Sequence, residues 1–276
     1  MDFENVLTLI QKELRDAFRN RWFLLYAAAF TGLSLALAWF SVSGAGSFGV
    51  AGFGRTTAGL INLILLIVPL MGLTLGAMSL AGEREKGTLI YLLAQPVSSG
   101  ELLLGKFIGL ALALTAALVI GFGLTGVLIV FLGNGGDFRI YLTLLVLSVI
   151  LAIATLSMGF LISAAVKKAA TAVGLALFLW LILVYFGDLG LMGTALVMQL
   201  DVEQLLAFAL INPLQVFKIA AVLDLRDNLE VLGPAGIFAY RTYGGTLWPL
   251  LVGLLFAWVV VPFLIATQVF KKRGVL

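Results

Sequence analysis

The sequence predicts an all-α integral membrane protein with six transmembrane helices. The mean hydropathy is +1.15, 62% of the residues are hydrophobic and only 11% are charged, which is typical of a chain that resides in a bilayer. Uncharged apolar runs of about 20 residues recur along the chain, and each is long enough to cross a hydrocarbon core of about 30 Å. Because these runs use most of the 276 residues, we expect a single transmembrane domain over residues 1–276.

Residues 1–21 predict an amphipathic helix. Apolar residues recur at helical spacing from Phe3 to Phe18, whereas charged residues that include Lys12 and Glu13 occupy the other face. The segment is too polar to span the membrane and too acidic for a signal peptide. We expect an interfacial helix on the inner membrane surface, with a solvated basic tail as the alternative.

The six spans are expected at residues 22–40, 58–80, 107–132, 140–166, 169–187 and 247–270. The second of these spans carries Gly72 and Gly76, a spacing that allows another helix to approach closely. We expect a helix contact there.

The connection at residues 81–106 is the only long polar interruption in the first half of the chain. It opens with the four consecutive charges Glu83–Lys86, which cannot lie in hydrocarbon and therefore place the segment at a membrane face, where a soluble partner can contact it. The apolar run behind them predicts a short helix that ends before Pro96. Ser98 or Ser99 is expected to cap a second helix, with Glu101 in its first turn.

The segment at residues 189–246 is the second informative connection. It predicts two amphipathic helices, broken at Asn212-Pro213. A seventh span across both is disfavoured, because Gln204, Gln215 and Lys218 would lie within it. Two interpretations remain open: the helices rest on the outer leaflet, or they form a platform on which another protein docks.

Lysine and arginine are distributed unevenly between the two sides of the predicted membrane. With both termini in the cytoplasm, twelve of the 17 basic residues fall in inner segments and five in outer segments. This asymmetry places residues 81–106 inside the cell. It leaves no ionisable residue deep within a span.

The composition also limits the chemistry. The chain has no cysteine and no histidine, and it lacks a phosphate-binding Gly-x-x-x-x-Gly-Lys-Ser/Thr motif, so we expect no enzymatic activity, no metal site and no ATP site in this chain. The excess of basic over acidic residues is explained by membrane topology and does not indicate nucleic acid binding. Met71, Thr74, Met78 and Met158 are candidates for a substrate path, with apolar packing, the more common role of methionine, as the alternative.

The stretch from Gly82 to Lys106 resembles the cytoplasmic loop of ABC-2 type permeases, the membrane subunits of one class of ABC transporter. The resemblance rests on the charged cluster, Gly-Thr, Leu-Leu, Pro-Val-Ser and the final Leu-Gly-Lys, in that order. It implies that this loop is a coupling helix that contacts a separate ATPase. The coupling residues would be Gly82, Glu83, Arg84, Glu85, Lys86, Gly87 and Thr88.

Over its full length the chain looks like the permeases of nitrous oxide reductase maturation, through residues 9–17, 211–218 and the basic tail at 271–273. This resemblance implies a homodimer in the bacterial cytoplasmic (inner) membrane, with two copies of a cytoplasmic ATPase that binds ATP and Mg. It also implies a periplasmic accessory protein on the outer helices. The docking residues would be Asn212, Pro213, Gln215, Phe217 and Lys218.

The function implied by that resemblance is export of a copper or sulfur species for the copper-sulfur site of the reductase. Two alternatives remain open. The chain could instead move a periplasmic partner mechanically with no transport, or export another small or lipophilic substrate.

Overall fold

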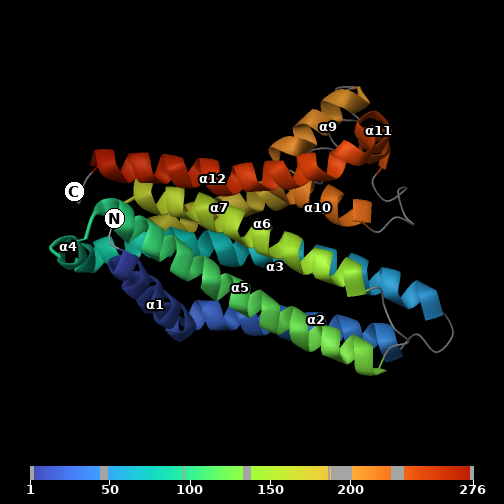
Figure 1. Cartoon of the computed structure of the whole chain (residues 1–276), viewed down its shortest axis with the longest axis horizontal. Coiled ribbons are helices and arrows are strands. Elements are labelled where there is room, and N and C mark those ends of the chain that lie inside the picture. The colour runs from blue at the N-terminus through green and yellow to red at the C-terminus, as the bar shows by residue number, and fades with distance from the viewer. Residues whose placement is uncertain are drawn as a thin grey trace.

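The computed structural model describes residues 3–43, 49–95, 97–132, 138–185, 187, 201–224 and 233–273, and within these ranges it contains helices and no strand (Figure 1). The predicted helix end at Pro96 and parts of the predicted outer segment lie outside them. The elements are α1 (Phe3–Arg19), α2 (Arg21–Ser43), α3 (Gly49–Glu85), α4 (Thr88–Leu93), α5 (Ser99–Leu132), α6 (Phe138–Ala165), α7 (Ala169–Tyr185), α9 (Val202–Ile211), α10 (Pro213–Asp224), α11 (Gly233–Tyr243), a 3-10 turn (Gly244–Thr246) and α12 (Leu247–Arg273).

Five helices are long and apolar enough to cross a membrane, or six if the bent pair α9–α10 counts as one span. Five of the six predicted spans correspond to α2, α3, α5, α6 and α12. The remaining one, predicted at 169–187, is α7, a shorter apolar helix of 17 residues. The structure therefore has five or six candidate spans, compared with the six that the sequence predicts.

Helix α5 begins at Ser99 and continues without a break to Leu132. The sequence predicted a separate capped helix followed by a span from residue 107, so that expectation is wrong in this detail. The predicted cap itself is confirmed: Glu101 accepts a 2.8 Å hydrogen bond from the backbone N–H of Ser98, whose hydroxyl accepts one of 3.3 Å from the N–H of Glu101. Lys106 consequently lies inside a helix and not in a loop.

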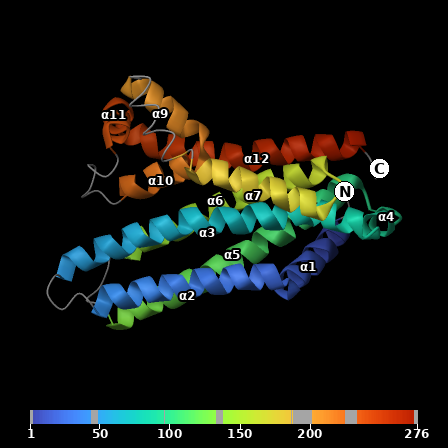
Figure 2. The ribbon, with the colours of Figure 1, turned by 180° about the vertical axis from the view of Figure 1, so that it is seen from behind.

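Helix α1 packs along the first turns of α5 (Figure 2). The reason is a pair of glycines in α5: a Cβ atom on Gly105 would lie 2.6 Å from the Cβ atom of Leu9, and one on Gly109 would lie 2.7 Å from that of Glu13. Glu13 was predicted on the solvent-exposed face, but it is buried together with Leu9 and Ala17. The helix still exposes Phe3, in line with an interfacial position.

The core of the molecule is the seam between α3 and α6. Gly72 and Gly76 lie directly against the backbone of α6, and Gly159 of α6 lies against α3, so that a side chain on any of them would collide with the other helix. The helix contact predicted from the two α3 glycines is confirmed. Small residues allow the two backbones to approach closely, which is how helices associate in a membrane.

Helices α9 and α10 meet at a bend of 112°. Neither of the two predicted arrangements describes α10, because it packs against α6 and α12 and buries nearly its whole length. Its apolar residues surround the helix and do not form one stripe, so no face remains for the leaflet surface. The beginning of α1, the end of α12 and α4 all lie at one end of the molecule, and α9 and α11 lie at the other (Figures 1 and 2).

Candidate functional site

The end of α3 and the short helix α4 form the predicted coupling loop. Helix α3 continues through the charged residues to Glu85, and Gly87 then reverses the chain with a positive φ of 72°. A residue with a Cβ atom is strained in this left-handed conformation, which explains the glycine. Helix α4 follows at once, so the predicted short helix is confirmed. The Thr88 hydroxyl donates a 3.2 Å hydrogen bond back to the carbonyl of Glu83.

A buried ion cluster fixes the loop to α1 and α5. The Nζ atom of Lys106 lies 2.6 Å from Oε1 of Glu13 and 2.8 Å from Oε1 of Glu83. Lys12 completes the cluster, with its Nζ atom 2.9 Å from Glu13 and 3.1 Å from Glu83. The Lys106 side chain is only 1% exposed, and that of Glu13 is 7% exposed.

The charges of the cluster depend on one another. Burial opposes the charge of Glu13, but the neighbouring ammonium groups of Lys106 and then Lys12 outweigh it and lower the pKa of this carboxyl below its ordinary value. Burial likewise favours the neutral form of Lys12, yet the carboxylates of Glu13 and Glu83 raise its pKa above the ordinary lysine value. The neighbouring charges therefore hold Glu13 and Lys12 in their charged states.

Arg84 and Glu85 fix the loop to the opposite side of the molecule. The Nη1 atom of Arg84 donates to the carbonyl of Val166, at 2.5 Å, just beyond the end of α6. The Oε2 atom of Glu85 accepts a 2.8 Å hydrogen bond from the N–H of Ala169, the first residue of α7. The positive charge thus meets a helix C-terminus and the negative charge a helix N-terminus, the arrangement that helix dipoles favour. Three of the four consecutive charges bind within the protein.

The exposed part of the loop lies on α4. Leu89 is fully buried and anchors the helix, while Ile90 is 60% and Tyr91 76% exposed. Lys86 and Thr88 are exposed beside them, and Gly82 lies half-buried in the last turn of α3. An exposed aromatic and aliphatic pair on a firmly anchored helix is typical of a protein-binding surface.

The candidate substrate path is mostly packed core. Met71, Thr74 and Met158 are buried and Met78 is half-buried. The Thr74 hydroxyl donates to the carbonyl of Leu70 in its own helix, at 2.6 Å.

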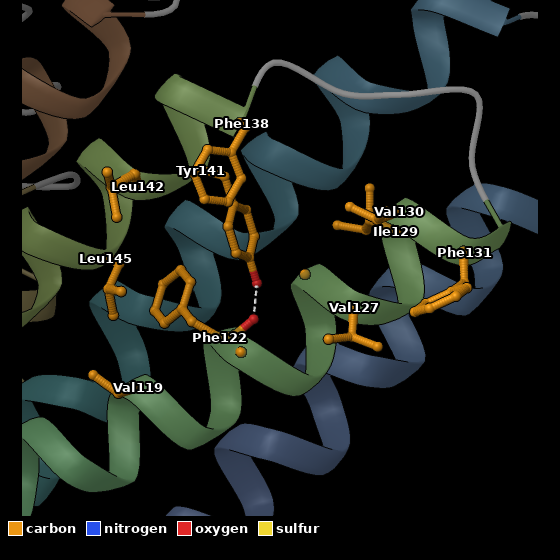
Figure 3. A pocket seen from close by; sticks show the side chains of 12 residues that line it. Val119, Phe122, Val127, Ile129, Val130, Phe131, Phe138, Tyr141, Leu142 and Leu145 are labelled. Atoms are coloured by element: carbon orange, nitrogen blue, oxygen red, sulfur yellow. Dashed lines mark hydrogen bonds between the residues drawn. The ribbon is translucent and has the colours of Figure 1, made fainter.

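A cavity of about 360 Å³ lies elsewhere, between the C-terminal half of α5 and the first turns of α6 (Figure 3). Its lining is apolar and includes Phe122, Val127, Tyr141 and Leu145. The Tyr141 hydroxyl donates a 2.6 Å hydrogen bond to the carbonyl of Phe122 across one side of it. None of the four candidate path residues lines this cavity, and the sequence did not indicate it.

The candidate docking residues on the outer side have internal roles. The Asn212 side chain donates to the carbonyl of Leu183 at the end of α7, at 2.7 Å, and accepts from the N–H of Leu214 at the start of α10, at 2.9 Å. Pro213, Gln215 and Phe217 are buried, and Lys218 is half-buried. The three buried side chains belong to the interior of the bundle, so their predicted contact with an outer partner does not fit this packing.

Among the residues that the structure describes, no three histidine, cysteine, aspartate or glutamate side chains gather to hold a metal ion. The most consequential site residues that sequence reasoning missed are Glu13 and Lys106. Glu13 is one of several charges on α1, Lys106 is a single charge between Gly105 and Phe107, and only the packing of α1 on α5 brings the two together.

Fold and site together define a multi-pass helical membrane protein with an anchored helix at one end that exposes Ile90 and Tyr91. A family model described as ABC-2 family transporter protein matches residues 7–275, and the chain belongs to this family. It is therefore an ABC transporter permease, a membrane subunit of a class that works with an ATPase and generally as a dimer.

Two relatives are similar over nearly their whole length. The "Probable ABC transporter permease protein NosY" of Stutzerimonas stutzeri is 30% identical over 275 residues, which cover 97% of this chain and 98% of that protein. The protein of the same name from Pseudomonas aeruginosa is 32% identical over 266 residues, which cover 90% and 97%. The predicted resemblance to ABC-2 permeases is confirmed.

Proposed function

We propose that this chain couples a cytoplasmic ATPase to events on the opposite side of the bacterial inner membrane, with α4 as the element that the ATPase contacts. The observation that carries the proposal is the contrast within the loop. Glu83, Arg84 and Glu85 fix it to α1, α5, α6 and α7, whereas Ile90 and Tyr91 point away from the protein. A force applied to α4 therefore reaches four helices at once.

The test is replacement of the exposed pair. Ile90→Ala with Tyr91→Ala removes the apolar surface of α4 while Leu89 still anchors the helix. We expect the variant permease to reach the membrane in the same amount as the native protein. After purification it should bind its ATPase at least about tenfold more weakly, because truncation of an aromatic anchor typically costs about 2 kcal/mol or more. Tyr240→Ala, an exposed tyrosine of α11 at the other end, is the matched control. Unchanged ATPase binding in the double variant would contradict the proposal.

The proposed cargo is a copper or sulfur species delivered towards nitrous oxide reductase, with a periplasmic accessory protein on the outer side. Support comes from the resemblance to permeases of nitrous oxide reductase maturation. The uncharged spans favour a neutral or protonated sulfur species over Cu(I), which would need ligands in place of its water. Copper transfer through Met71 and Met78 would require the packing around Met71 to open, because this side chain is only 1% exposed.

Proteoliposomes that contain the complete complex separate these versions. Labelled sulfur and labelled copper are followed in parallel with ATP present. Movement of either label that is lost on disruption of Glu83–Thr88 supports transport. Replacement of Met71 and Met78 by leucine, which nearly conserves volume, should abolish copper movement alone if the thioethers carry it.

Mechanical transmission is the second candidate. The observation that favours it is the burial of α10 between α6 and α12, because a displacement of these spans moves α10 and the attached α9 directly. If neither label moves while ATP still changes the conformation of an outer partner, transport is wrong and mechanical transmission stands.

A further inference from the structure

We propose that Lys106 is a positioning residue for ATPase coupling, which holds Glu13 of α1 and Glu83 of the loop together so that α1 moves with α4. This inference rests on the proposed contact between α4 and an ATPase and assigns a task to α1, which would otherwise be only a surface anchor.

The first argument is the geometry of the ion cluster. The single ammonium group of Lys106 bridges two carboxylates that come from elements 70 residues apart in the chain, at 2.6 and 2.8 Å. Lys106 is among the largest fully buried side chains, so its charge is compensated by these partners and not by water. Without it, only Lys12, whose side chain is 39% exposed, would remain to offset the repulsion between Glu13 and Glu83.

The second argument is the difference between the two sides of the loop. Towards α6 and α7, Arg84 and Glu85 bind backbone groups at helix ends, in line with the helix dipoles. Towards α1 and α5, the connection of the Glu83 side chain consists of lysine side chains. The position of α1 relative to the loop is thus set by one ionic joint, and Lys106 is its buried centre.

The third argument is the fit of α1 on α5. Gly105 and Gly109 leave room for Leu9 and Glu13, so α1 rests in close contact with the same turns of α5 that carry Lys106. Close packing and the ionic joint act on the same stretch of α1. A motion of Glu83 is therefore passed to α1 as a whole and not to one side chain.

The test uses Lys106→Met in the complete complex with its ATPase, reconstituted in lipid. Lys12 still lies close to both carboxylates, so one cation stays in the cluster, and we expect the variant to fold. We expect the permease-dependent kcat for ATP to fall by about tenfold with an unchanged KM for ATP and unchanged assembly of the complex. Lys106→Arg should restore most of the loss. Lys272→Met, an exposed lysine at the same end of the molecule, is the matched control.

A distance measurement tests the joint motion itself. Because the chain has no cysteine, single cysteines for spin labels can be placed at the exposed positions Gln11 of α1 and Gln95 after α4 without other thiols to remove. In the native cluster we expect the distance between these labels to be the same with and without an ATP analogue. In Lys106→Met it should become dependent on the analogue.

The outcomes are distinct. If Lys106→Met keeps full coupling, or if the native distance changes with the analogue, the inference is wrong. Should Lys106→Met not assemble, Glu13→Gln, which keeps the side-chain volume, takes its place in both measurements under the same expectations. If the variants of Ile90 and Tyr91 leave ATPase binding unchanged, the proposed function fails first; if they weaken it while Lys106→Met does nothing, only the role of Lys106 fails.

Discussion

The Oγ atom of Ser163 in α6 accepts a 2.9 Å hydrogen bond from the backbone N–H of Leu80 in α3. It accepts a second one, of 2.8 Å, from the N–H of Ala81. A side chain of one helix thus satisfies two backbone donors of another, within one turn of the charged loop. This relationship joins the C-terminal ends of α3 and α6.

Ser163→Ala should therefore destabilise the protein by about 1–3 kcal/mol, because both hydrogen bonds that join α3 to α6 at this point are lost. Thermal unfolding of the detergent-solubilised protein measures the effect. Ser148→Ala is the matched control: this serine is also buried, but its hydroxyl donates to Leu144 in its own helix, so the bond that is lost does not join two helices. Equal shifts for the two variants would refute the proposed role of Ser163.

Gly76→Ala should disturb the same seam by steric means. The new Cβ atom would lie 2.8 Å from the backbone nitrogen of Phe160, and rigid backbone cannot yield cheaply. We expect a loss of about 1–3 kcal/mol, measured by thermal unfolding. At Gly174 of α7 nothing lies within 4 Å of the added atom, and alanine there should be neutral or stabilising. A Gly76→Ala protein as stable as Gly174→Ala would contradict the close contact.

Acid should weaken the ion cluster. The pKa of Glu13 is lowered in the folded protein, so its contribution to stability is present above its ordinary value of 4.5 and is lost as the pH falls below it. Lys12 affects stability at alkaline pH instead. Its pKa is raised in the folded protein, so its contribution to stability is fully present below its ordinary pKa of 10.5 and is lost only at higher pH. We expect the melting temperature to fall as the pH drops from about 6 to about 3.5, and to fall less in Glu13→Gln than in the native protein. The exposed Glu203→Gln should leave the profile unchanged; identical profiles for all three would exclude the cluster as a cause.

Reporter fusions test the proposed orientation. A fusion within the predicted inner loop at Gly100 should report the cytoplasm, and fusions at Gly135 and Gly233 should report the outer side, because basic residues concentrate with the termini and α4. The beginning of α1, the end of α12 and α4 lie at one end of the molecule, which agrees with this expectation. A reversed signal at any of the three sites would overturn the orientation.

The sequence was sufficient for features that depend on local chemistry. The serine cap with Glu101 in the first turn of the following helix and the short α4 follow from residue type and spacing, and both are present in the structure. The spacing of Gly72 and Gly76 indicated a helix contact but not its partner, which is α6. The apolar spans follow from hydropathy in the same way.

Features that depend on tertiary partners could not be predicted. Glu13 looked like one of several surface charges, because nothing local shows that Gly105 and Gly109 make space for its helix. Phe217 looked like part of an outer surface, because the burial of α10 depends on α6 and α12. For the same reason the charges of Arg84 and Glu85 gave no sign that they would bind the ends of α6 and α7.

The ion cluster also constrains when parts of the protein can fold during synthesis. Glu13 and Lys106 are 93 residues apart, so at a synthesis rate of about 5–20 residues per second the carboxylate waits roughly 5–20 s for its lysine. During that time α2 and α3 are synthesised, and Glu83 is added only 23 residues before the same lysine. The end of the molecule that carries α4 is thus completed late, because α1 and α3 can be joined through the cluster only after Lys106 has been made.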